Sequence, residues 1–106
     1  MENNSINQTL EKLTKIAGNA ALQVNGVGSL VNAPINFNMI TREYSKGVSM
    51  AAVNNELIFD LYINIRIGGN IPEIAFKVQE HVKKTIEKVC NKQVSKVNIH
   101  VQGIDF

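Results

Sequence analysis

Two stretches of the chain alternate between large apolar and polar residues, which is the pattern of a β-strand with one buried face. In residues 57–67 the apolar side chains occupy every odd position, and residues 94–104 alternate in the same way. A third strand-like run, residues 48–53, ends at Asn54-Asn55. Because Asn tolerates positive φ, this pair predicts a two-residue hairpin turn into the strand at residue 57.

Two other stretches repeat apolar residues every three or four positions, as an amphipathic helix does. The first helix is predicted from about residue 6 to residue 24, with a Ser-x-x-Gln capping box at Ser5 and a stop at Asn25-Gly26. The second runs to about residue 90, and Asn70 and Glu73 have the spacing of a capping box at its start. The positions assigned to the buried sides are Ile6, Leu10, Leu13, Ile16, Ala17, Ala20, Ala21 and Val24 in the first helix, and Ile71, Ile74, Ala75, Val78, Val82, Ile86 and Val89 in the second.

The segment from residue 27 to residue 47 fits more than one structure. Gly28-Ser29-Leu30-Val31 could form a short strand. Ile35, Phe37 and Met39 alternate with Asn, but Pro34 restricts such a strand to a sheet edge. A long surface loop fits the segment equally well.

These elements assemble in few ways. If the strands at 57–67 and 94–104 are parallel, the helix between them makes a right-handed crossover and covers one face of the sheet, beside the first helix. The predicted fold is therefore α+β: a two-layer sandwich with two amphipathic helices on one face of a small mixed β-sheet. The order is α-β-β-α-β, with room for an extra short strand within residues 28–40.

Composition narrows the class of protein. The 106 residues, 44% of them hydrophobic and 19% charged, predict one globular domain over residues 1–106. A formal net charge of +2 is too small to argue for nucleic acid by itself. The single cysteine, Cys90, excludes an internal disulfide and is typical of a reducing cytoplasm. Since no apolar run reaches the roughly 18 residues of a membrane span, we expect a soluble, cytoplasmic protein.

Residues suited to catalysis are few. His81 falls at the edge of the buried side of the second helix, which indicates a structural role. Cys90 lies near a helix C-terminus, where the dipole disfavours a thiolate. The turn Gly68-Gly69-Asn70 matches no nucleotide-binding motif, although any helix start can hold an anion. We predict no catalytic residue, no cofactor, no metal and no small-molecule substrate, and therefore not an enzyme.

Surface residues of the second helix are better candidates for contacts with a partner. A basic row on its far side consists of Lys77, Lys84 and Lys88. This row is either a solvated surface with charge pairs, such as Glu80 with Lys84, or a binding site for phosphates or lipid headgroups. Phe76 falls outside the buried side of the second helix. It is either an exposed anchor for a partner or is packed against the first helix or the long loop.

The polar face of the sheet is the other candidate. Such a face is usually solvated, but it could also pair with a second copy or another protein. Tyr62 and Arg66 are its candidate contacts, and Tyr62 is the one aromatic residue predicted there, which is few for an RNA-binding sheet. The residues assigned to this face are Asp60, Tyr62, Asn64, Arg66, Asn98, His100 and Gln102.

Several segments resemble the alkaline shock protein family of Gram-positive bacteria, also described as general-stress or envelope-stress-response proteins. The resemblance covers nearly the whole chain. Ile16–Ala21 with Val24–Val27 is similar to the first-helix signature of the family, and Leu57–Ile67 is similar to its central strand. The most specific segments are Gly69-Asn70-Ile71-Pro72-Glu73-Ile74-Ala75, Val78-Gln79-Glu80-His81-Val82-Lys83 and Val97-Asn98-Ile99-His100-Val101-Gln102-Gly103.

The resemblance implies a small, cytoplasmic, non-enzymatic protein. Some family members self-associate and are held near the membrane by a separate anchor protein, and others are connected with control of fatty-acid synthesis. We therefore expect a structural or adaptor protein of the envelope or alkaline stress response, which acts by contact with a protein partner or by self-association. If it lies near the membrane, we expect a membrane-anchored partner to hold it there. The alternative is a nucleic-acid-binding α+β module.

Overall fold

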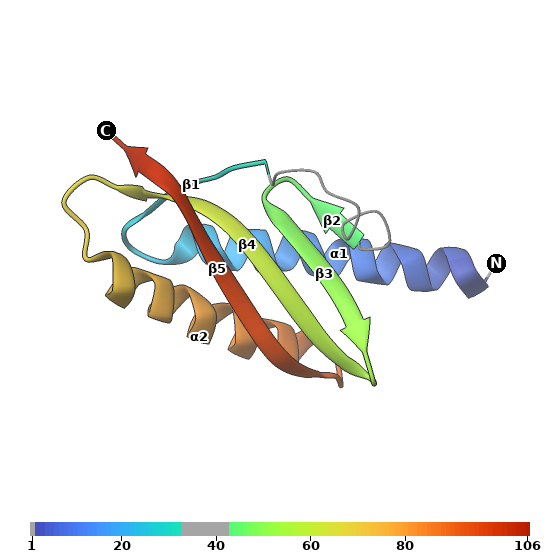
Figure 1. Ribbon diagram of the computed structural model, residues 1–106. Coiled ribbons are helices and arrows are strands. Elements are labelled where there is room, and N and C mark those ends of the chain that lie inside the picture. The colour runs from blue at the N-terminus through green and yellow to red at the C-terminus, as the bar shows by residue number, and fades with distance from the viewer. Residues whose placement is uncertain (1, 33–42) are drawn as a thin grey trace.

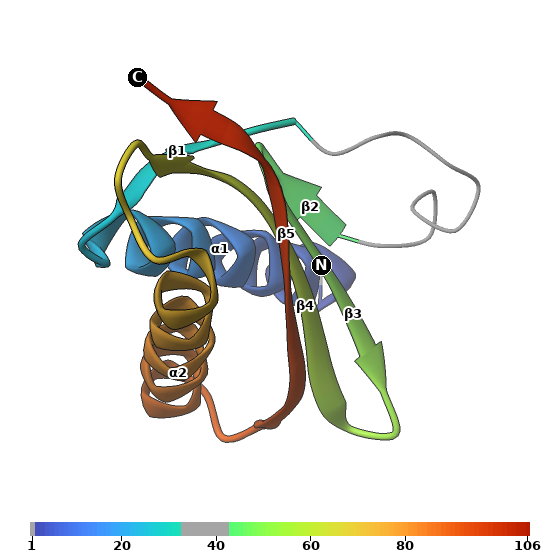
Figure 2. The ribbon, with the colours of Figure 1, turned by 60° about the vertical axis from the view of Figure 1, so that its left-hand side comes forward.

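A mixed sheet carries two helices on one of its faces (Figure 1). The computed structural model describes residues 2–32 and 43–106, with side chains described for residues 11–32 and 46–106. Figure 2 shows both helices on the same side of the sheet, as the sequence predicts. Within the described residues the elements are α1 (Glu2–Gln23), β1 (Val27–Leu30), β2 (Glu43–Ser45), β3 (Val48–Val53), β4 (Glu56–Arg66), α2 (Ile71–Val89) and β5 (Gln93–Asp105).

Strand β4 is the centre of the sheet. Strand β5 runs parallel to it along one side, from the pair Glu56 and Gln93 to the pair Arg66 and Asp105. On the other side β3 pairs antiparallel with the first half of β4, and β1 pairs antiparallel with its last residues. The short β2 extends the sheet beyond β3. Since β4 and β5 are joined through α2, the predicted parallel strand–helix–strand unit is confirmed.

The hydrophobic core lies between β4 and the two helices. The odd-numbered side chains of β4 from Leu57 to Ile65 are fully buried, as their alternation predicts. The buried side of α2 is narrower than predicted, because Ile71 and Val89 are 40% and 54% exposed. They are the first and last residues of the helix and therefore have helical neighbours on one side only. The buried apolar side chains of the helices, among the described residues, are Leu13, Ala17, Ala20 and Ala21 in α1 and Ile74, Val78, Val82 and Ile86 in α2.

The start of α1 differs from the prediction. The helix begins at Glu2, so Ser5 lies inside it and the capping box predicted there is wrong. No Gly or Pro interrupts residues 2–5, and an acidic residue at position 2 is favourable at the positive end of a helix. The first turns of α1 extend beyond the sheet (Figure 1). At the other end, Gly26 adopts a φ of 103° and leads directly into β1.

The predicted hairpin and the extra short strand are both present. Asn54 and Asn55 have φ values of 51° and 64°, and they join β3 to β4. The strand expected within residues 28–40 is β1, at Val27–Leu30. β2, at Glu43–Ser45, was not predicted, because three residues are too few to show an alternation. The alternating residues 35–39 lie outside the described part of the chain.

Candidate interaction surfaces

The start of α2 is fixed by its cap. Asn70 has extended backbone angles, and its Oδ1 accepts a hydrogen bond from the Glu73 amide at 3.0 Å. Glu73 also pairs with Lys77, whose Nζ lies 3.1 Å from its Oε1. The predicted cap is therefore confirmed, whereas the ion pair described on this basic row joins Lys77 to Glu73 rather than Lys84 to Glu80.

Beside this helix start lies a shallow depression of about 390 Å³. Arg66 and Lys77 both line it, together with the Gly68-Gly69 turn and Glu73. Arg66 is exposed, as predicted, and Lys84 and Lys88 are exposed on later turns of α2. The structure therefore brings together two of the predicted contact residues, Arg66 and Lys77, along with the acidic Glu73.

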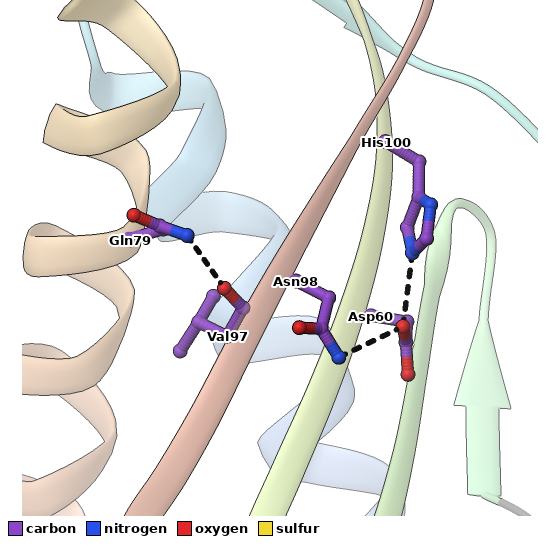
Figure 3. A network of polar contacts seen from close by, with 5 residues as sticks. All are labelled: Asp60, Gln79, Val97, Asn98 and His100. Atoms are coloured by element: carbon purple, nitrogen blue, oxygen red, sulfur yellow. Dashed lines mark hydrogen bonds and ion pairs between the residues drawn. The ribbon is translucent and has the colours of Figure 1, made fainter. Parts of the chain in front are cut away.

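Two side chains of α2 bind the backbone of β5 on the side away from β4. Gln79 Nε2 donates to the Val97 carbonyl at 2.9 Å (Figure 3). Glu87 Oε2 accepts from the Val94 amide at 2.9 Å. A small groove of about 150 Å³ runs along this junction, lined by Gln79, Glu80, Lys83, Val94, Ser95, Lys96 and Val97.

Phe76 lies one turn before Gln79 on the same flank of α2. Its side chain is 59% exposed, so the alternative in which it packs against α1 is wrong, while most of the loop named in that alternative lies outside the described residues. Its exposure is what a contact residue requires, but it is far from the predicted Tyr62: α2 covers one face of the sheet, and Tyr62 belongs to the other. Phe76 and Tyr62 therefore belong to two separate surfaces.

The polar face of the sheet carries a connected cluster around Asp60 (Figure 3). Asp60 Oδ1 lies 2.9 Å from His100 Nε2 and accepts a hydrogen bond from Asn98 Nδ2 at 3.2 Å. The His100 ring stacks on Tyr62, with ring centroids 4.4 Å apart and the planes within 10°. Asp60 was predicted to face solvent, but it keeps only 9% of its exposure, so that expectation is wrong. A carboxylate this deeply covered needs such partners.

A second polar cluster ties three strands together near the end of β5. Asp105 accepts hydrogen bonds from Ser29 Oγ at 2.7 Å and from Asn64 Nδ2 at 2.9 Å. Ser29 belongs to β1 and Asn64 to β4, so one carboxylate joins the end of β5 to both of these strands. We did not predict either cluster. The parallel register, which places Tyr62 opposite His100 and Asp60 opposite Asn98, is the signal that would have found the first one.

His81 and Cys90 occupy structural positions. His81 Nε2 lies 2.8 Å from Gln23 Oε1, which links the end of α1 to α2. Cys90 Sγ donates to the Ile86 carbonyl at 3.4 Å at the end of α2. Among the described residues, no group of three or more His, Cys, Asp or Glu side chains converges as a metal site would require. In the same part of the chain, no helix is long and apolar enough to cross a membrane.

The arrangement defines a class of protein: a small α+β domain with helices on one sheet face and polar side-chain clusters on the other. The chain belongs to the alkaline shock protein 23 family, described as having a cell envelope-related function, whose family model matches residues 1–106. This is the alkaline shock protein family that the sequence resembles.

Relatives in two bacteria are similar over most of the chain. The uncharacterized protein YqhY of Bacillus subtilis (strain 168) is 30% identical over 102 residues, which are 91% of this chain and 73% of YqhY. The uncharacterized protein Spy1535 of Streptococcus pyogenes serotype M6 is 31% identical over 93 residues, which are 87% of this chain and 72% of Spy1535.

Solved structures share the fold. The MamM CTD variant H264A-E289A-C267S superposes with a TM-score of 0.57 at 12% sequence identity, covering 91% of this chain and 96% of that one. The zinc form of the MamM CTD variant D249N gives 0.58 at 11% identity, covering 93% and 90%. At this level of identity the likeness concerns the fold alone.

Proposed function

We propose that this protein acts as a non-enzymatic structural or adaptor component of the cell envelope or its stress response, through contacts with other proteins or with copies of itself. The observation that carries this proposal is the exposure of Phe76. A phenylalanine that keeps 59% of its surface in water gains little for folding, whereas aromatic side chains dominate the energetics of protein interfaces. The cell envelope-related function of the family supports the same proposal.

A partner of this kind, held at the membrane by its own anchor, would place the protein in the cytoplasm close to the membrane. The end of the molecule where β4 meets α2 suits a contact, because Ile67 there is 63% exposed beside the polar depression lined by Arg66 and Lys77. Apolar side chains ringed by charged ones are the usual composition of a transient interface.

Affinity capture tests the proposal. The tagged full chain and its Phe76→Ala variant would be recovered from cells of a bacterium that encodes it, in mild detergent, and analysed by mass spectrometry, with the oligomeric state measured by sedimentation. We expect a protein partner or self-association that the wild-type chain shows and that Phe76→Ala weakens.

Lys12→Ala is the control, since Lys12 is an exposed helix residue of α1 that belongs to none of the candidate contact surfaces. The melting temperature of both variants should equal that of the wild type, because exposed substitutions of this kind change stability by about 0.5 kcal/mol or less. Recovery of no protein partner together with a monomer at all concentrations would overturn the proposal.

A further inference from the structure

Strand β5 lies at an edge of the sheet for its whole length. It pairs with β4 on one side, and in the part of the chain that the structure describes no strand lies on its other side. An exposed edge offers unpaired amide and carbonyl groups to any extended segment, so proteins usually protect it. Here the protection covers one half only: Glu87 binds the Val94 amide and Gln79 binds the Val97 carbonyl.

Beyond Val97 the edge is available for pairing. The register against β4 is regular from Lys96 to Val101, with irregularities only before and after this stretch. In a regular strand, the backbone groups of alternate residues point to the same side. Because the Val97 carbonyl points away from β4 towards α2, the amide and carbonyl groups of Ile99 and Val101 also point to the open side.

The flank of α2 above this edge could cover an added strand. Phe76 lies on that flank, one turn before Gln79, and is exposed, while Ala75 next to it is half-buried. On the strand itself, Ile99 and Val101 are partly exposed on the same face of the sheet as the helices. Every second side chain of a strand placed beside β5 would therefore contact an apolar strip formed by α2 and β5.

The charges at the edge select a kind of partner. Lys83 and Lys96 line the groove at the protected end, with Glu80 as its acidic residue, so the groove carries an excess of one positive charge. We propose that the edge of β5 from Asn98 to Val101 binds an extended segment of another protein as an added strand. The segment would carry apolar residues at alternate positions and an acidic residue at the end near Lys83 and Lys96.

A foreign segment fits this edge better than a second copy of the chain. Two copies of β5 paired about a two-fold axis would bring an irregularity of each strand, after Val101, against the regular stretch of the other. Irregularities of this kind interrupt pairing. With Ile99 facing Ile99 at the axis of this antiparallel pair, Lys96 of one copy would lie opposite Gln102 of the other, so neither copy would place an acidic residue against Lys96.

This inference rests on the proposed function and names the surface and the partner through which it would act. Amide hydrogen exchange of the full chain, measured by NMR, tests its first step. We expect the amides of Ile99 and Val101 to exchange rapidly at all protein concentrations, and those of Asn98 and His100, which face β4, to exchange slowly. Protection of Ile99 and Val101 that rises with protein concentration would assign the edge to a second copy and overturn the proposal.

Selection of peptides tests the second step. A library of random linear nonapeptides displayed on phage would be selected against the immobilised full chain, and the enriched peptides synthesised. We expect apolar residues at every second position together with Asp or Glu, and protection of the Ile99 and Val101 amides when peptide is added. Failure to enrich any sequence, or enriched peptides that protect other amides, would overturn the proposal.

Substitutions at one position separate backbone pairing from side-chain contact. Ile99→Pro and Ile99→Ala both remove the isoleucine side chain, but only proline removes the amide donor, which an edge strand tolerates on its open side. We expect peptide affinity about tenfold weaker for Ile99→Pro than for Ile99→Ala, and Lys83→Glu to weaken it most at low salt. Equal affinities for the two Ile99 variants, with both folded by circular dichroism, would contradict strand addition. If the captured cellular partner is retained by Ile99→Pro, the edge proposal fails while the proposed function stands.

Discussion

At the scale of single residues, two aspartates organise the polar face of the sheet. Asp60 joins β4 to β5 through Asn98 and His100, and Asp105 joins β5 to β4 and β1 through Asn64 and Ser29. In the first cluster Asp60 is the buried member, with 9% of its surface exposed, and its carboxylate is stable there because Asn98 and His100 donate hydrogen bonds to it.

Replacement of Asp60 tests this. Asp60→Ala removes the acceptor shared by Asn98 and His100 and should lower the free energy of unfolding by about 1–3 kcal/mol, measured by urea denaturation. Asn98→Ala is the control: it removes one donor from an exposed residue and should cost less than about 1 kcal/mol. Equal costs for the two variants would show that Asp60 is not the centre of the cluster.

Gly28 gives a second prediction at this scale. A Cβ at this position would collide with Asp105 Oδ2 and lie 3.0 Å from Asp105 Cβ, so the close approach of β1 to the end of β5 requires glycine. Gly28→Ala should lower the free energy of unfolding by about 1–3 kcal/mol, as overpacking usually does. Since most of the collision is with the carboxylate, the cost should fall in an Asp105→Ala background; additive costs in this double-mutant cycle would rule out the clash.

The polar face illustrates what the sequence could predict for single residues. The alternation in the two long strands placed Tyr62, Asn98 and His100 on one face, and the structure agrees. Their mutual contacts depend on the register between strands that are about 40 residues apart in the chain. Hydrophobic patterning sets which face a strand buries, but it does not fix the register of a parallel pair joined through a helix.

At the scale of elements, α2 was the best predicted part of the chain because three independent signals agree there. Its apolar residues recur at helical spacing, Asn70 caps its first turn, and Pro72 lies within that turn. The start of α1 was predicted less well, since a Ser-x-x-Gln pattern at Ser5 indicates a cap only when the preceding residues are not helical. Residues 27–47 fitted more than one structure, and the two strands described there have only four and three residues.

The cap of α2 can be tested directly. Asn70→Ala removes the acceptor for the Glu73 amide, which lies at 3.0 Å, and should lower the free energy of unfolding by about 1 kcal/mol. Asn70→Asp keeps an oxygen acceptor and adds a negative charge at the positive end of the helix, so its stability should match that of the wild type or exceed it. Equal destabilisation by Ala and Asp in urea denaturation would show that the cap does not act through this bond.

At the scale of the whole molecule, helices cover one sheet face and leave a polar face, an edge strand and an exposed Phe76 for contact with other molecules. The layers followed from the sequence, because two amphipathic helices and an alternating central strand have one way to bury all three apolar sides. The surfaces did not follow, because the helical spacing left two positions open for Phe76, one exposed and one packed. Only the placement of α2 against β5 and α1 decided between them.

The charge distribution gives the last prediction, which concerns nucleic acid. Two of the lysines pair with acidic residues, Lys77 with Glu73 at 3.1 Å and Lys15 with Glu11 at 3.5 Å, and the net charge is only +2. A phosphate-binding surface needs several unopposed cations, each of which adds to the salt dependence of binding. We therefore expect no retention of single-stranded RNA or duplex DNA at micromolar protein in about 20 mM salt, measured by fluorescence anisotropy.

Glu73→Lys provides the comparison, because it frees Lys77 and adds a cation beside Arg66 in one depression. We expect this variant to bind nucleic acid weakly, and the binding to disappear as salt rises. Tight binding by the wild-type chain that falls steeply with salt would instead favour the nucleic-acid-binding module.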